Sequence, residues 1–173
     1  MKPVCMFHII LLFGFILLLT NQTGNVNALI FENNPFYGLS NHEIKTVEST
    51  TNDTLTNVKL EYAPTELQNG SPEFFKATLF YAKTGQIVLH ADTDIVISKD
   101  GNELYKASNE FSQPFVHTPN GIVLSSYKFP DSGQYIITVK ILGINFMPVN
   151  PKEVTFTANV SDSNDKYIVN IGT

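Results

Sequence analysis

The chain has 173 residues and a formal net charge of −5 at pH 7, from 11 basic and 16 acidic side chains. Every basic residue is a lysine. An acidic chain without arginine lacks the bidentate guanidinium contacts that usually recognise phosphates and guanine, so we expect no nucleic-acid partner. Cys5 is the only cysteine, which excludes an intramolecular disulfide.

The amino-terminal segment 1–28 has the layout of a secretory signal peptide. Lys2 precedes an apolar run over residues 7–19, and Val26-Asn27-Ala28 fits a small-residue cleavage site. Cleavage there leaves 173 − 28 = 145 residues, enough for one domain with its own core. The alternative is an uncleaved anchor, because the apolar run approaches the about 20 residues of a membrane span. We therefore predict a secreted or extracytoplasmic envelope protein that meets the membrane only through this segment, if it is retained.

Residues 29–56 are rich in Asn, Thr, Ser and Glu and predict a polar lead-in that is partly ordered at most. Alternation of apolar and polar residues begins at 58–62, where Val58, Leu60 and Tyr62 share one face of a strand. Further extended segments with turn residues between them follow at 74–81, 87–98, 103–106, 122–129, 136–141 and 153–160.

Two turns in this series have a specific chemistry. Lys99-Asp100-Gly101-Asn102 predicts a tight hairpin, because Asp-Gly readily adopts positive φ angles. The segment 129–135, with Asp131, Gly133 and Tyr135, is typical of an immunoglobulin-type tyrosine corner, in which the tyrosine hydroxyl bonds back to the corner. These features predict an all-β chain, an immunoglobulin-like antiparallel β-sandwich of about seven strands over residues 57–161.

The carboxyl-terminal part carries two further expectations. Pro148 and Pro151 should interrupt pairing before the last strand, since proline cannot donate to a ladder, and Met147 should pack into the core. Residues 162–173 are predicted to be a polar tail, in which 166–171 could add an edge strand.

The order of turns and strands over about 57–161 resembles the immunoglobulin-like exported domains of uncharacterised archaeal cell-envelope proteins and, more distantly, YtkA-like sandwiches. The motifs that carry the resemblance are Lys99-Asp100-Gly101 and the corner at 130–135. The paired cysteines and core tryptophan of antibody domains are missing. The resemblance implies a place outside the cytoplasmic membrane and no particular activity, because one sandwich fold hosts many functions.

A metal site is the most specific chemistry that the residues suggest. His90 and Asp92 are spaced to lie on the same side of a strand, and His117 lies in a loop before another strand. If that loop folds back beside the end of the His90 strand, two imidazoles and one carboxylate would meet, a donor set suited to copper or zinc. The alternative is that these are unrelated polar residues at strand ends. Asp92 with Asp94 supplies too few oxygens for a calcium loop.

Catalysis has little support in the sequence. The chain has no nucleophile-elbow serine, no glycine-rich phosphate loop and no cysteine that a histidine could activate after signal removal. We therefore expect no enzyme and no obligatory cofactor. The predicted function is a non-enzymatic module that contacts other cell-envelope proteins or serves as an accessory domain; the alternative is an extracytoplasmic copper or zinc binding protein that uses His90 and His117. Asn52 and Asn159 lie in glycosylation sequons, a weak signal in an Asn- and Thr-rich chain.

Overall fold

The computed structural model describes residues 43–163. The predicted signal peptide, residues 29–42 of the lead-in and the possible strand at 166–171 lie outside the described residues. Within the described range, no helix has the length and apolar character that a membrane span needs.

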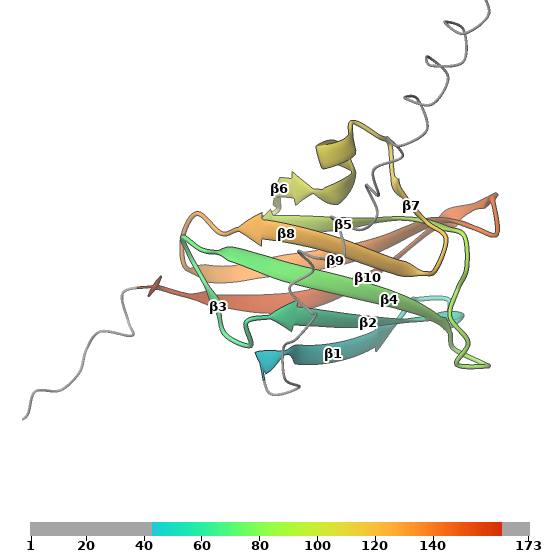
Figure 1. Cartoon of the computed structure of the whole chain (residues 1–173), viewed down its shortest axis with the longest axis horizontal. Coiled ribbons are helices and arrows are strands. Elements are labelled where there is room, and N and C mark those ends of the chain that lie inside the picture. Colours follow the sequence, from blue (N-terminus) through green and yellow to red (C-terminus); the bar gives the residue numbers. More distant parts are fainter. Residues whose placement is uncertain (1–42, 164–173) are drawn as a thin grey trace, which may run out of the picture. The chain divides into compact units, whose positions relative to one another are not determined.

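Two β-sheets stack face to face, as Figure 1 shows. The first sheet has the order β1-β2-β4-β8, and the second has the order β3-β10-β9-β5-β6, with β7 paired to β5. The all-β sandwich is thus confirmed, with ten strands in the described part where about seven were expected. The strands are β1 (Lys45–Thr50), β2 (Thr56–Ala63), β3 (Leu67–Gln68), β4 (Pro72–Tyr81), β5 (Ala91–Lys99), β6 (Asn102–Lys106), β7 (Val116–Thr118), β8 (Ile122–Lys128), β9 (Gly133–Ile144) and β10 (Met147–Ser161).

The core lies between the sheets and follows from alternation along the strands. On β9 the inward positions are Tyr135, Ile137, Val139 and Ile141, all nearly inaccessible to solvent. Facing strands contribute in the same way, so a single core holds both layers together without a disulfide. Its other buried members include Val58, Leu60, Phe75, Ala77, Leu79, Ile95, Ile97, Val123, Phe129, Val154, Phe156, Ala158 and Val160.

The outer face of β5 is also covered. Asp94 and Val96 point away from the core, yet both are buried. A 3₁₀ turn, η2 (Ala107–Phe111), lies over this face, and the Ser108 amide donates to Asp94 at 3.0 Å. Lys106 adds an ion pair to the same carboxylate at 3.5 Å. The buried Asp94 carboxylate therefore holds the segment after β6 in place. These partners also compensate for the cost of burying its charge.

Strand β1 corrects the predicted lead-in. It pairs antiparallel with β2 along its whole length, from Lys45 opposite Tyr62 to Thr50 opposite Asn57, so the lead-in ends before β1 instead of at residue 56. Five of its six side chains are exposed. A strand whose only half-buried side chain is Val47 shows no apolar alternation, so the sequence pattern could not reveal it.

The expected interruption of pairing at the prolines is present, but it lies inside strand β10 instead of before it. The strand already begins at Met147, and Pro148 lies opposite Gly143 of β9; a register shift separates this pair from the next one, Lys152 opposite Ile141. The neighbour on the other side, β3, pairs only with Val160 and Ser161. The proline-containing part of β10 is therefore an open edge, where a missing amide donor costs little.

The tyrosine corner is confirmed, and it anchors one end of the sandwich. The Tyr135 hydroxyl donates to the Asp131 carbonyl at 2.9 Å and also contacts its carboxylate. Lys99, from the expected hairpin, pairs with the Asp131 carboxylate at 2.7 Å and lies 4.8 Å from the centre of the Tyr135 ring. We call this end, built from residues 64–73, 99–101 and 129–135, the corner end.

Glu73 is an unusual member of the corner end because its side chain points into the core. It is fully buried, and one carboxylate oxygen accepts the amide of Gln68 at 3.0 Å. The second oxygen, Oε2, is buried and makes no hydrogen bond with any residue in the 43–163 range. Burial of the charged form raises the pKa of Glu73 from 4.5 to about 7.

Candidate binding surface at the loop end

Four connections meet at the opposite end of the sandwich and form one continuous surface, which we call the loop end: residues 51–55, 82–90, 117–121 and 145–147. Backbone bonds join neighbouring connections, with the Ala82 amide donating to Leu55 at 3.0 Å and the His90 amide donating to Pro119 at 3.2 Å. The turn between β9 and β10 is linked to β4 through Asn145, whose side-chain amide donates to the Tyr81 hydroxyl at 3.3 Å.

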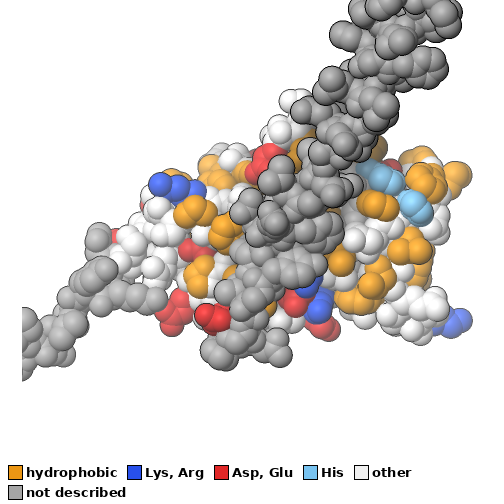
Figure 2. Space-filling view, in the orientation of Figure 1, with side chains coloured by type: hydrophobic (Ala, Val, Ile, Leu, Met, Phe, Trp, Pro, Cys, Tyr) orange, Lys and Arg blue, Asp and Glu red, His pale blue; other side chains and the backbone are white. Residues whose placement is uncertain are grey.

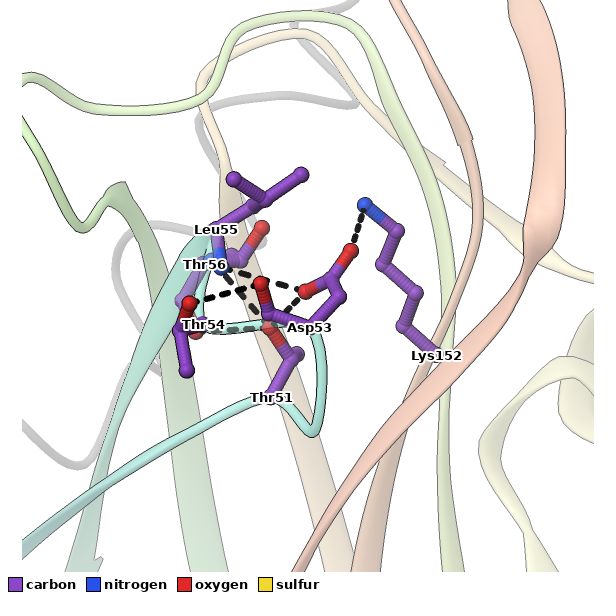
Figure 3. Close-up of polar contacts among 6 residues, drawn as sticks. All are labelled: Thr51, Asp53, Thr54, Leu55, Thr56 and Lys152. Atoms are coloured by element: carbon purple, nitrogen blue, oxygen red, sulfur yellow. Dashed lines mark hydrogen bonds and ion pairs between the residues drawn. The ribbon is translucent and has the colours of Figure 1, made fainter.

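The first of these connections, between β1 and β2, is held by Asp53 (Figure 3). Its carboxylate accepts the Thr51 hydroxyl at 2.7 Å and the Leu55 amide at 3.1 Å, and pairs with Lys152 of β10 at 2.5 Å. The lysine and the two hydrogen bonds favour the charged form and lower the pKa of Asp53 to about 2. The turn is thus fixed across the two sheets, and it presents Leu55 to solvent with 60% of its surface exposed.

A glycine brings two further connections into contact. Gly121 has a φ angle of +67°, and a Cβ there would lie 2.2 Å from the carbonyl oxygen of Val88. No other residue could combine this backbone conformation with so close an approach. Gly121 therefore sets how tightly the turn before β8 packs on the connection between β4 and β5.

His117 and Asp92 come together across a pair of strands. His117 is in β7, directly opposite Asp92 of β5, and its Nδ1 lies 2.7 Å from Asp92 Oδ1. Asp92 is also opposite Gly143 of β9, where a Cβ would lie 2.5 Å from Asp92 Oδ2. The absence of a side chain at Gly143 gives the carboxylate its room beside the imidazole.

His90 completes a cluster of three rings. It precedes β5 with a φ angle of 47°, outside the regular strand conformation that its spacing to Asp92 suggested. Its ring centre lies 4.2 Å from that of Phe146 and 5.9 Å from that of His117, with the rings within 30° of parallel. His90 Nδ1 is buried and has no hydrogen-bond partner among the described residues.

The predicted approach of the His117 segment to the His90 strand is therefore present, and the predicted role remains a prediction. Asp92 lies against His117 Nδ1 as a hydrogen-bond partner. Over residues 43–163, no group of three or more His, Cys, Asp or Glu side chains is arranged around one point as a metal site requires. The arrangement offers two imidazoles and one carboxylate that orients the second of them.

The loop end also carries most of the exposed apolar side chains. The described residues include eight large hydrophobic side chains with high exposure, and five belong to this end: Leu55, Ile87, Leu89, Phe146 and Met147. In Figure 2 the two histidines lie near one end of the visible face among hydrophobic side chains. Met147, expected in the core, is 67% exposed, as is Phe146. The turn directs both of them outward.

The backbone at Phe146 has a strained conformation. Asn145 and Phe146 have φ angles of 52° and 63°, which a two-residue hairpin turn requires at both positions. Glycine is the favoured residue at the second position, and a bulky side chain is disfavoured there. Sequence reasoning missed Phe146 as a surface residue; the available signal was the Asn-Phe pair between Gly143 and Pro148, which has the length of a tight hairpin turn.

A shallow cavity of about 400 Å³ opens beside these residues. Its accessible lining is mostly apolar, with Leu55 and Ile144 among the lining residues, and Tyr81, Lys83, Gln86 and Lys152 also line it. Small-molecule sites are usually deep and enclose most of the ligand, so the open shape of this cavity fits a contact with another macromolecule better.

Comparison with known proteins adds little to this description. No family model matches the chain, and no curated protein matches it. Among solved structures, a "Putative Lipoprotein from Bacillus anthracis" aligns with a TM-score of 0.32 and 13% identity, covering 66% of this chain and 85% of that chain. So remote a similarity supports no conclusion about function, and the resemblance to archaeal envelope domains and YtkA-like sandwiches stays a prediction.

Proposed function

We propose that the protein is a non-enzymatic binding module of the cell envelope, exported by its amino-terminal segment, and that the loop end is its contact surface for another envelope protein. The observation that carries the proposal is the concentration of exposed apolar side chains at this end, with Phe146 and Met147 each 67% exposed. Exposed apolar side chains that are grouped in this way usually mark an interaction site.

The way in which these side chains are held supports the proposal. Leu55 lies on a turn fixed by Asp53 and Lys152, and Phe146 stacks on His90. Side chains on turns that are already ordered lose little conformational freedom when a partner binds, so more of the interaction energy remains as affinity. Aromatic and methionine side chains are also enriched at the centres of protein interfaces.

The test compares two double variants of the full chain in its own cells. Leu89→Ser with Phe146→Ser removes two apolar side chains of the loop end. Leu104→Ser with Leu124→Ser is the matched control, since both residues are exposed, at 44% and 38%, and belong to β6 and β8. Cross-linking followed by mass spectrometry of the envelope fraction should identify envelope proteins linked to the wild type and to the control.

The loop-end variant should lose these cross-links while it keeps the wild-type midpoint of urea unfolding. Retention of every cross-link in a folded loop-end variant would refute the loop end as the contact surface. Recovery of the chain from the cytosolic fraction alone would refute the location in the envelope.

A further inference from the structure

We propose that the connection between β2 and β4, residues 64–71, is a strap that stays closed over the Glu73 carboxylate in acid and opens locally when that carboxylate ionises. The strap contains the two-residue strand β3, which joins it to β10 of the other sheet. This inference goes beyond the proposed contact surface, because the strap belongs to the corner end and the contact surface is the loop end.

Few interactions hold the strap in place. Its strand β3 pairs with only two residues of β10, Val160 and Ser161. The Asn69 amide donates to the Ser161 carbonyl at 3.1 Å. The Gly70 amide donates to the Phe129 carbonyl at 2.9 Å. A segment with so little pairing can open while the rest of a fold stays closed.

Glu73 lies under the strap. The Gln68 amide donates to one of its carboxylate oxygens at 3.0 Å, and Gln68 also lines an open cavity of about 420 Å³ at the surface. The strap therefore separates a fully buried carboxylate from solvent. Leu67 of the strap is 3% exposed and belongs to the core, so the strap is closed in this structure.

The closed strap suits only the neutral form of Glu73. Its second oxygen, Oε2, is buried and accepts no hydrogen bond from any residue in the 43–163 range. An ionised carboxylate in this place would have one amide donor, whereas a buried carboxylate usually needs two or three. Local opening gives the ionised group access to water. Ionisation of Glu73 therefore favours the open strap.

No neighbouring charge compensates for the burial of Glu73. Several titratable side chains lie on the elements next to it, and no ion pair joins any of them to Glu73 within the described residues. They are Tyr62 of β2, Glu66 of the strap, Tyr127 and Lys128 of β8, Asp131 and Tyr135 of the corner, and Asp162 after β10. Tyr127 lies directly opposite Glu73, and burial raises its pKa as well.

The direction of the effect follows from the two states of the strap. In the closed state, burial raises the pKa of Glu73 to about 7, and the Gln68 amide opposes this shift. In the open state, the carboxyl is hydrated and its pKa returns toward 4.5. The closed strap is therefore most stable below pH 4.5, loses stability as the pH rises toward 7, and gains nothing from Glu73 above that.

The experiment is amide hydrogen exchange of the full chain at pH 5 and pH 8, with each rate compared with that of an unfolded peptide at the same pH. The amides of Gln68, Asn69 and Gly70 report on the strap. Their protection should fall by about 30- to 100-fold between the two pH values. The amides of Ile137 and Val139 in β9 should also lose protection, because global unfolding exposes Glu73 too, but they should remain better protected than the strap at both pH values.

Two uncharged variants test the role of the carboxylate. Glu73→Gln keeps an acceptor for the Gln68 amide and cannot ionise, so the protection of its strap should be the same at pH 5 and pH 8. Glu73→Met, of similar length, serves in the same way if Glu73→Gln does not fold. Glu103→Gln changes an exposed residue of β6 and is the matched control, which should follow wild type.

Three results would overturn the proposal. Strap amides that are as well protected as those of β9 at pH 8 would show that the strap opens only when the whole chain unfolds. Strap protection in wild type that does not change between the two pH values would show that ionisation does not open it. A fall of wild-type size in the uncharged variants would assign the effect to another group.

Discussion

The two ends of this sandwich use their connections in opposite ways. At the corner end, aromatic rings are buried: Phe129 makes edge-to-face contacts with Tyr135 at 4.7 Å and with Phe75 at 6.2 Å. At the loop end, Phe146 stacks on His90 with most of its surface in solvent. The same kind of side chain thus stabilises the fold at one end and remains available for contact at the other.

Backbone strain follows the same division. Six described residues other than glycine have positive φ angles, and four of them are at the loop end: Thr54, His90, Asn145 and Phe146. Strained residues of this kind persist when the surrounding structure fixes them, and they concentrate at functional sites. Most of the strained positions therefore lie at the end of the sandwich for which we propose a binding role.

The largest difference in stability between the two ends is expected when one phenylalanine at each end is replaced by alanine. Phe129→Ala should lower the free energy of unfolding by about 3–5 kcal/mol, because it removes a fully buried ring and leaves a cavity. Phe146→Ala should change it by less than about 1 kcal/mol, since the ring is exposed and its backbone is strained. Urea unfolding measures both. Equal losses would contradict the division between the ends.

The second effect concerns Glu73 and pH. Its pKa is raised to about 7 in the fold, so the folded protein binds this proton more tightly than the unfolded chain does. The resulting stability is present in full below the unfolded pKa near 4.5, falls as the pH rises through the interval up to about 7, and is lost above it. We expect wild type to lose about 2–3 kcal/mol between pH 4.5 and 8 relative to Glu73→Gln, which keeps an acceptor for the Gln68 amide.

Urea unfolding of both proteins at several pH values measures this difference. Glu103→Gln, at an exposed position of β6, is the control and should follow the wild-type curve. Parallel curves for wild type and Glu73→Gln would show that Glu73 ionises normally in the fold.

A smaller effect is expected at the tyrosine corner. Tyr135→Phe keeps the buried ring and removes only the hydroxyl that donates to the Asp131 carbonyl. One such bond contributes about 0.5–1.5 kcal/mol, so the loss should be of this size and well below that of Phe129→Ala. Tyr81→Phe, which removes a hydroxyl at the loop end, should cost less than Tyr135→Phe because its bond of 3.3 Å is exposed. The reverse order would contradict the assignment of the corner as the stabilising end.

The smallest effect is expected for Asp53→Asn. The pKa of Asp53 is lowered to about 2, so its contribution is present above the unfolded pKa near 3.8 and is lost as the pH falls through about 2. The stability of wild type should therefore exceed that of the variant slightly at pH 6, and the two should converge between pH 4 and 2. Thermal unfolding across this range checks the trend, and a constant difference would show that the carboxylate charge has no role.

The corner end was largely predictable from the sequence, because its chemistry is local. Tyr135 follows Asp131 by four positions, and Asp100-Gly101 forms its turn from adjacent residues. The core of β9 was predictable for the same reason, since alternation is visible within one strand. Strand β1 was not, because it has no buried face of its own and is defined only by its pairing with β2.

The candidate site was predictable only in part. The sequence indicated that His117 would approach Asp92 only if the loop that carries it folded back. The pairing of β7 with β5, which places His117 opposite Asp92, satisfies this condition. The stacking of Phe146 on His90 depends on a hairpin turn some 55 positions away in the chain, and no local pattern encodes that contact. The exposure of Met147 was not predicted, because the hydrophobicity of a side chain does not show whether its strand extends beyond the core at that residue.

The short parallel strand β3 has a consequence for how the chain acquires its structure. It pairs Leu67 with Val160, and the Ser161 hydroxyl bonds to Leu67 across 94 positions of the chain. The partner of an early segment is therefore the last strand of the described sandwich to leave the ribosome. Pairings between such distant segments slow folding, because the chain between them loses conformational entropy before the stabilising contact forms. A chain built in this way completes its second sheet only when its final strand is available, a delay that is compatible with the proposed export of the chain before it folds.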